Sequence, residues 1–308
     1  MTGVVAGSTL QQAIRGAPRV PVPAPTLAAM TEAVTPPARE ALVRWPRRHA
    51  RLARDGVVEL GPPRVVLSIA IGVFVIVFGR LVYLRHERFG SFDFDLGIYD
   101  QAVWLLAHGH GFDTVRGLGV FGNHVNLGFY LLVPFYWLGA GPNFLNMVMV
   151  IAVGLAAVPV FRLGRHWLTD EWHALIPALA FLLHFTTQWV IQETFHAEVV
   201  AMAPFLMAYL AATEKRWRAY ALWLVFAVSW KEDIALAAIM VGLLLAMRGH
   251  RDGDTTTRRN GVLTVVVALG WFLVCTRLII PAFSPGGCST RTSSVLSATR
   301  RGPSPTRR

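Results

Sequence analysis

Long apolar runs separated by short polar connections dominate the chain from residue 64 onward. The first run, Arg64 to Leu84 (RVVLSIAIGVFVIVFGRLVYL), matches the roughly 20 residues that a helix needs to cross a bilayer. Later runs cover about residues 127–140, 144–161, 174–190, 198–213, 218–230, 233–247 and 261–281. This pattern predicts an all-α fold, a polytopic integral membrane helix bundle with about seven to eight hydrophobic segments.

The two ends of the chain differ from this apolar centre. Residues 1–64 are rich in Ala, Pro and Arg, and repeated prolines interrupt any helix, so we expect a disordered basic segment in the cytoplasm. Residues 287–308 consist mainly of Ser, Thr, Arg and Pro, which predicts a disordered tail and suggests a truncated or frame-shifted end. The transmembrane domain is then residues 65–286. Its long first outer loop, about residues 85–126, is expected to carry short interfacial helices.

Composition and charge agree with a membrane protein. Of the 308 residues, 54% are hydrophobic and only 15% are charged, whereas soluble domains average about 25% charged residues. A net charge of +11 can indicate nucleic-acid binding, but the basic residues lie in the end segments and in short connections rather than on one face. We therefore expect membrane lipid, and no nucleic acid, among the partners. The two cysteines cannot form a disulfide framework or a tetrahedral thiolate site.

The distribution of Lys and Arg predicts how the chain is oriented. The connections near residues 161–167, 214–218 and 248–260 are basic, as is the leading segment, so the positive-inside rule assigns them to the cytoplasm. The loop at 85–126 and the connections QETFHAE (192–198) and WKED (230–233) then face outward. Acidic residues and histidines therefore collect on one side of a multi-pass protein of the cell membrane.

The run at residues 127–140 decides whether this orientation is consistent. A full crossing there would change the side of the basic connection at 161–167. The run is short, contains Pro134 and ends at GAGPN, which favours a partial or re-entrant element. A full crossing with a basic outer loop is the alternative.

The stretch SFDFDLGIYDQAVW, directly after the first span, contains Asp93, Asp95 and Asp100. Apolar residues at helical spacing after Gly97 predict a short helix in the membrane interface, with Tyr99 and Trp104 at headgroup depth. Asp95 near the helix start could cap free N–H groups. The functional alternative is a general base, or a ligand for a metal or a substrate hydroxyl.

Three further polar motifs lie on the expected outer side. The segment FGNHVN supplies His124, and QETFHAE places His196 and Glu198 at the start of an apolar run. The segment SWKEDIAL places Lys231 and Glu232 between two apolar runs, where charges are costly unless they lie at an interface or in a cavity. Interfacial histidines and charges at a loop tip are the structural alternatives. Binding of a phosphate or a metal is the functional one.

Four segments together resemble an uncharacterised bacterial membrane-protein family, domain of unknown function 2079. They are FDFDLGIYDQAVW, GNHVNLGFYLLVPFYWL, FHAEVVAMAPFLMAYLAATEKRW and SWKEDIALAAIMVGLLL. The resemblance covers about residues 65–286, and the run from Phe94 to Gln101 is its most specific part. Where the family often reads F-H-P-E, this chain has Ala197.

That family is in turn similar to the C-type glycosyltransferases, which carry an acidic motif in the first outer loop. The resemblance implies transfer of a sugar from a polyprenyl-phosphate donor to an acceptor at the outer membrane face. It implies Asp95 or Asp93 as the base that activates the acceptor hydroxyl. It also implies a set of candidate ligands for substrate, carrier phosphate or a divalent metal: Asp100, Gln101, His124, His196, Glu198, Lys231 and Glu232.

Two other functions remain as alternatives. A transporter would place ionisable residues near the centres of its spans, where this chain offers only Arg80 and His184. A non-catalytic membrane protein is the second alternative, and a truncated chain would favour it. The sugar, carrier, acceptor and metal cannot be derived from the sequence.

Overall fold

The computed structural model describes residues 61–91 and 94–284 of the chain. Most of the predicted cytoplasmic segment, the predicted tail and Asp93 lie outside these residues. The first described helix, α4 (Pro62–Glu87), begins two residues before the predicted span and ends three residues after it. Its two leading prolines fit the first turn of a helix, where a missing N–H group costs no hydrogen bond.

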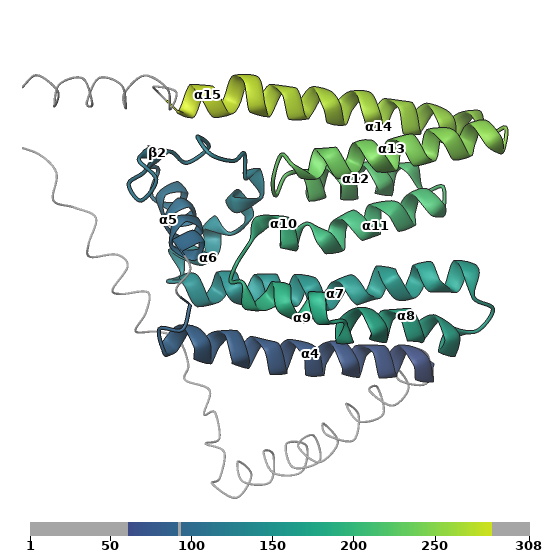
Figure 1. The fold of residues 1–308 in the computed structure, drawn as a ribbon, viewed down its shortest axis with the longest axis horizontal. Helices are drawn as coiled ribbons and strands as arrows, with labels where there is room; N and C mark the ends of the chain where they lie inside the picture. Colours follow the sequence, from purple (N-terminus) through teal and green to yellow (C-terminus); the bar gives the residue numbers. More distant parts are fainter. Residues whose placement is uncertain (1–60, 92–93, 285–308) are drawn as a thin grey trace, which may run out of the picture. The chain divides into compact units, whose positions relative to one another are not determined.

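Helices running between two ends of a bundle make up most of the described chain (Figure 1), which confirms the predicted all-α membrane fold. Five of these helical segments are long and apolar enough to cross a membrane. Three of them are the single helices α4, α7 (Pro142–Trp167) and α13 (Ile234–Arg251). The fourth combines α8 (Glu171–Leu183) and α9 (Phe185–Gln192). The fifth is α14 (Thr255–Val274), which continues through a π-helical turn (Cys275–Ile279) into α15 (Ile280–Phe283). The shorter helices α10 (Ala197–Val200), α11 (Met202–Thr213) and α12 (Trp217–Val228) run alongside them.

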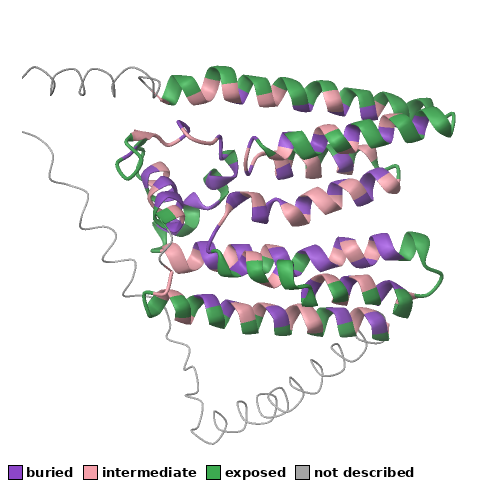
Figure 2. Ribbon diagram, viewed as in Figure 1, coloured by how far each residue is buried: buried purple, intermediate pink, exposed green. Residues whose placement is uncertain are grey.

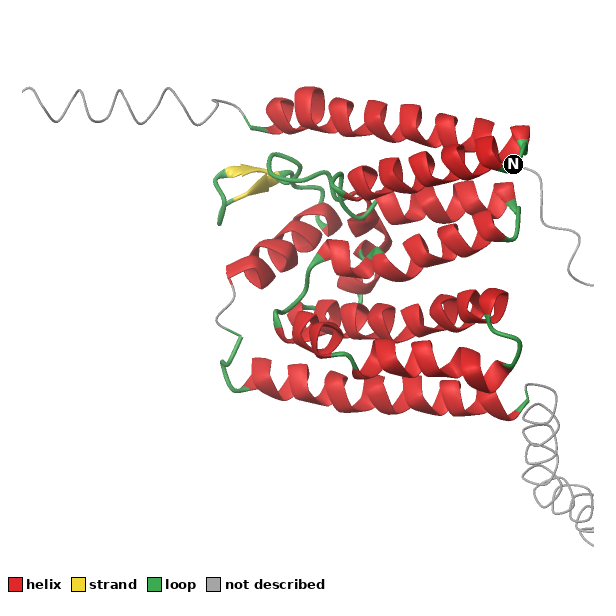
Figure 3. Cartoon of the chain, turned by 45° about the vertical axis from the view of Figure 1, so that its right-hand side comes forward, coloured by secondary structure: helices red, strands yellow, loops and turns green. Residues whose placement is uncertain are grey.

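The region between α4 and α7 contains only short elements. It consists of α5 (Phe94–Ala107), a two-stranded antiparallel hairpin of β1 (Phe112–Asp113) and β2 (Leu118–Gly119), a 3-10 helix (Leu127–Leu131) and α6 (Val133–Trp137). Figure 3 shows this hairpin at the edge of the bundle. The five residues of α6 span about 7.5 Å at 1.5 Å per residue, far less than a bilayer. The 3-10 helix and α6 together hold about half of the residues that a crossing needs, which favours a partial element at 127–140 over a full crossing.

The central helix of the bundle is α7. In its most apolar stretch 61% of the residues are buried, whereas the share is 17% in the span that starts at Thr255. Figure 2 shows the same contrast. Leu145, Met149 and Val153 are fully enclosed, and α4, α8 and α11 pack around them. Because lipid tails are as apolar as these side chains, close packing rather than the hydrophobic effect stabilises such contacts in a membrane. α7 also contacts α5 and α10, so it supports the elements that carry the acidic and histidine motifs.

The two ends of the bundle differ in chemistry. One end, here called the basic end, comprises the connections 168–170, 214–216 and 252–254 with the adjoining helix termini. The opposite end, here called the site end, comprises segments 88–141, 193–196 and 229–233. Ion pairs tie the basic end together: Arg162 to Glu214 (2.8 Å), Arg165 to Glu171 (3.1 Å) and Lys215 to Asp254 (2.8 Å). The basic connections thus share one end and the acidic motifs share the other, as the sequence predicts.

Candidate functional site

Polar side chains from four segments meet at the site end. They come from the first turn of α5, the loop before the 3-10 helix, the start of α10 and the connection between α12 and α13. Several contacts link segments more than 100 residues apart in the chain. The backbone carbonyl of Trp230 accepts from the side-chain amide of Asn126 (2.6 Å), and Ser229 O accepts from Gly128 N–H (2.7 Å). These contacts fix the loop against the α12–α13 connection.

Asp95 faces His196 across the mouth of this cluster. The Asp95 carboxylate lies 3.6 Å from Nε2 of His196, and 48% of the Asp95 side chain is exposed, so a dissolved substrate can reach it. The other imidazole nitrogen, Nδ1, donates to the carbonyl oxygen of Thr194 (3.1 Å), since a carbonyl can only accept. A favourable contact between Nε2 and the carboxylate therefore requires a proton between them.

The backbone before His196 is in an unusual conformation. Thr194 has φ 68°, in the left-handed region, which is costly for a β-branched residue. This turn ends α9, and it places the Thr194 carbonyl beside the imidazole of His196, which is the N-cap residue of α10. The local strain thus serves to position His196.

Tyr99 lies behind the Asp95–His196 pair. Its ring makes edge contacts with Phe129, Phe195 and His196, at centroid distances of 5.8, 5.5 and 6.1 Å. Burial, followed by the negative charges of Glu198 and Asp95, raises the pKa of Tyr99 above its ordinary value. Its hydroxyl therefore stays protonated and can only donate or accept a neutral hydrogen bond. The structure buries Tyr99 among protein side chains, and its place at headgroup depth remains a prediction.

Lys231 is surrounded by carboxylates. Its ammonium group lies 3.0 Å from Oε1 of Glu198 and 3.8 Å from Asp233, and only 11% of its side chain is exposed. The second oxygen of Glu198 is buried and has no hydrogen-bond partner among the described residues. Two carboxylates already balance the charge of Lys231, so the role predicted for it as a phosphate ligand remains a prediction.

His124, Glu232 and Asp233 form a second group beside Lys231. Nδ1 of His124 lies 2.7 Å from Oε1 of Glu232, whose other oxygen accepts from the Val125 N–H (2.8 Å). One ligand atom from each of His124, Glu232 and Asp233 lies within 4.8 Å of the others. Imidazole and carboxylate ligands suit several divalent metals, but binding there would have to replace the His124–Glu232 hydrogen bond. The sequence indicated His124 and Glu232 as candidate ligands, and Asp233 lies in the same charged WKED segment as Glu232.

The buried Glu232 predicts acid sensitivity at this end. Burial favours its neutral form, but hydrogen bonds from His124 and the Val125 N–H outweigh burial and lower the pKa of Glu232. A lowered pKa stabilises the fold above the ordinary glutamate value of about 4.3, and this stability is lost as the pH falls through the lower value of the folded protein. Thermal unfolding in detergent between pH 6 and 3 should show this loss. We expect a steeper fall in melting temperature for the wild type than for Glu232→Gln, and parallel curves would contradict the assignment.

Asp100 and Gln101 hold the scaffold together. Asp100 accepts a hydrogen bond from the Tyr136 hydroxyl (2.7 Å) and so connects α5 to α6. Burial raises the pKa of Asp100, and the hydrogen bond from Tyr136 opposes this shift. The amide of Gln101 donates to Thr114 (2.6 Å) and its oxygen accepts from Val115 N–H (3.1 Å). Both side chains already have partners, and the substrate roles predicted for them remain predictions.

Comparison with known families agrees with the topology. Residues 85–301 match the model of the family described as predicted membrane protein, DUF2079, and this match covers more than half of the chain. No curated protein matches the chain, and no solved structure does.

Proposed function

Because the chain belongs to the DUF2079 family of predicted membrane proteins, we propose that it is a multi-pass membrane enzyme. In this proposal it transfers a sugar from a polyprenyl-phosphate carrier to an acceptor hydroxyl at the membrane face. The observation that carries the proposal is the half-exposed Asp95–His196 pair at the site end, next to the Lys231 cluster.

The reaction needs one base and one leaving group. The acceptor oxygen attacks the anomeric carbon, the bond from this carbon to the phosphate oxygen breaks, and the electron pair leaves with the polyprenyl phosphate. Asp95 removes the acceptor proton as the new bond forms, which is general base catalysis. His196 acts as a positioning residue: its Nδ1–H bond to Thr194 fixes the ring, and its Nε2 fixes the carboxylate. The proton taken up stays on Asp95 and then passes to water at the exposed side of this carboxyl group.

The two ends of the bundle support a proposed orientation of the protein. The basic end carries the ion-paired arginines and lysines, and positively charged connections of membrane proteins lie in the cytoplasm. The start of α4 lies at the basic end (Figure 1), so the segment before it is proposed to be cytoplasmic. The site end then faces outward, where a carrier-linked sugar and a water-soluble acceptor can meet.

The proposal can be tested with the purified full chain in proteoliposomes. A set of polyprenyl-phosphate sugars, radiolabelled in the sugar, is offered together with envelope glycan acceptors. We expect time-dependent, protein-dependent transfer of label to the acceptor, and a slower reaction for His196→Asn with little change in KM for the carrier. Empty liposomes and the protein inactivated by heat are the controls. Transport of labelled sugar into the lumen without transfer would instead indicate a transporter. The absence of both transfer and transport would indicate a non-catalytic protein.

The ionisable residues inside the spans give little support to the transporter alternative. His184 caps α9 by accepting a hydrogen bond from Thr186 N–H (3.2 Å), and it is exposed. Arg80 is also exposed and makes no ion pair with the described residues. Neither residue forms the buried, paired charge that a proton or ion pathway through the bundle requires.

A further inference from the structure

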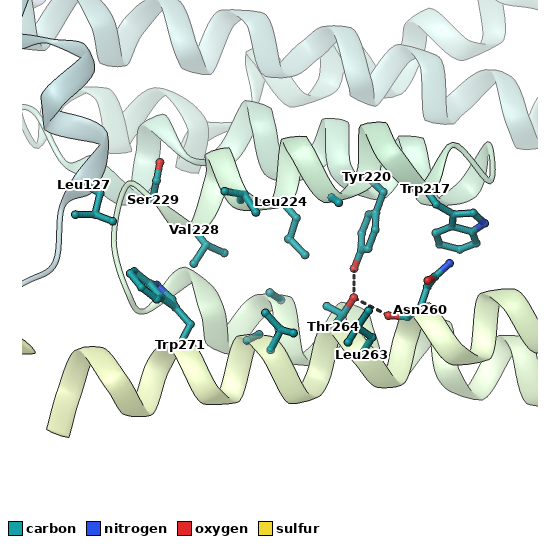
Figure 4. Close-up of a pocket in the computed structure, with 15 residues that line it drawn as sticks. Leu127, Trp217, Tyr220, Leu224, Val228, Ser229, Asn260, Leu263, Thr264 and Trp271 are labelled. Atoms are coloured by element: carbon teal, nitrogen blue, oxygen red, sulfur yellow. Dashed lines mark hydrogen bonds between the residues drawn. The ribbon is translucent and has the colours of Figure 1, made fainter. Parts of the chain in front are cut away.

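A cavity of about 540 Å³ separates α12 from α14, although both helices contact α13 (Figure 4). This volume lies within the range of about 300–1,000 Å³ that is common for sites of small organic ligands. The facing stripes repeat every three or four residues: Tyr220, Leu224 and Val228 on α12, and Thr264, Val267 and Trp271 on α14. No charged residue lines the cavity, so its lining fits a hydrocarbon.

Polar side chains line the end of the cavity toward the basic end. The hydroxyl groups of Tyr220 and Thr264 form a hydrogen bond of 2.8 Å across the space, and Trp217 and Asn260 lie beyond it (Figure 4). Since Thr264 also donates to the carbonyl of Asn260 (2.8 Å), the Tyr220 hydroxyl is the donor in this pair. The bond crosses the cavity near this end.

The opposite end of the cavity lies at the site end. Leu127 and Ser229 line it there, and Ser229 accepts the hydrogen bond from Gly128 N–H that fixes the site loop. Lys231 follows Ser229 by two residues. From Tyr220 to Ser229 the cavity runs about 13 Å along the helix axis at 1.5 Å per residue. A chain that fills it therefore ends close to the polar cluster.

Trp271 adds a polar group to this end of the cavity. Its indole N–H is buried and has no hydrogen-bond acceptor among the described residues. A buried donor without a partner is unfavourable, so a ligand that brings an oxygen to this place is favoured. A hydrocarbon chain with a phosphate at one end satisfies both the apolar lining and this donor.

We propose that the cavity between α12 and α14 binds the isoprenoid chain of a polyprenyl phosphate, with its phosphate end toward Trp271 and Ser229. The identity of this lipid rests on the function proposed above. The apolar lining takes a hydrocarbon chain, and the unpartnered indole N–H of Trp271 faces the phosphate oxygen at the end of that chain. Only the part of the chain next to the phosphate contacts the cavity, and the remainder lies in the bilayer.

Photolabelling of the full chain in nanodiscs tests this site. The probe is a short-chain polyprenyl phosphate that carries a diazirine near its phosphate end, and labelled peptides are identified by mass spectrometry. We expect label on α12 and α14, displaced about tenfold better by unlabelled polyprenyl phosphate than by phosphatidylglycerol. Ala221→Trp fills the cavity and should lower this labelling about tenfold. Leu222→Trp is the matched control, since Leu222 is 73% exposed and does not line the cavity, and its labelling should stay unchanged.

Other outcomes would overturn the inference. Equal displacement by phosphatidylglycerol would identify an ordinary acyl chain as the occupant. Undiminished labelling of an Ala221→Trp protein with wild-type elution and melting temperature would exclude the cavity. Labelling must also persist in Asp95→Asn, because binding needs no base. Specific labelling without any sugar transfer would refute the proposed function alone, and Asp95-dependent transfer without labelling here would refute this inference alone.

Discussion

Replacing Asp95 by asparagine is expected to lower the rate of sugar transfer about 10²–10⁴-fold, the usual loss when a general base is removed. The asparagine side chain keeps the size of the carboxylate but cannot accept the acceptor's proton. Its effect on stability should be small, since half-exposed ion pairs such as Asp95–His196 contribute about 0–1 kcal/mol. The measurement is initial transfer rate at saturating carrier, together with the melting temperature of the same preparation.

Asp170 provides a matched control for this substitution. Its side chain has the same exposed fraction, 48%, but it lies at the basic end and accepts a hydrogen bond from Trp172 N–H as the N-cap of α8. Asparagine caps helices as well as aspartate does, so Asp170→Asn should keep both the fold and the transfer rate. An Asp95→Asn protein as active as Asp170→Asn would refute Asp95 as the base. Asp93→Asn, measured in parallel, decides whether the neighbouring aspartate takes that role.

Much of the bundle could be predicted because each span is a local feature of the chain. A run of apolar residues needs no information about its neighbours to be recognised as a membrane helix, so α4, α7, α13 and α14 lie where the runs lie. The breaks inside runs were harder to predict. α8 ends at His184, whose ring caps α9, and α10 gives way to α11 at Ala201. Such breaks depend on single hydrogen bonds and leave the hydropathy unchanged.

The sequence predicted on which side of the membrane the candidate site lies, but it did not predict the contacts between the site residues. The charge asymmetry of the connections indicated that Asp95, His196 and Lys231 share one end. It could not show that His124 pairs with Glu232, because 108 residues separate them and only the packing of α12 and α13 against the loop joins them. Spacing in the sequence likewise gave no sign that Asp100 would bond to Tyr136. Tertiary packing decides these pairs.

Substituting leucine for Gly261 is expected to destabilise the protein most strongly among changes away from the site. α13 and α14 form a hairpin in which the two backbones touch: a Cβ atom on Gly261 would lie 2.7 Å from Gly242 O and 2.9 Å from Ala246 Cα, and would also meet Ala246 N. Backbone atoms of a packed helix cannot move aside as a side chain can. Overpacking of this kind costs about 1–3 kcal/mol and occasionally more. Thermal unfolding in detergent should therefore show a fall of several degrees, at about 2–4 °C per kcal/mol for a domain of this size.

Gly270→Leu, on the same helix, is the control that distinguishes the steric clash at Gly261 from the general effect of replacing glycine by leucine. A Cβ atom there meets nothing within 4 Å, and leucine favours a helix over glycine by up to about 1 kcal/mol, so Gly270→Leu should melt at or above the wild-type temperature. Equal melting temperatures for the two variants would show that α13 and α14 do not pack backbone to backbone. The hairpin also matters for the cavity, because α13 contacts both α12 and α14 and so sets the distance between their facing stripes. Gly261→Leu is therefore expected to weaken photolabelling of the cavity as well, whereas Gly270→Leu should leave it intact.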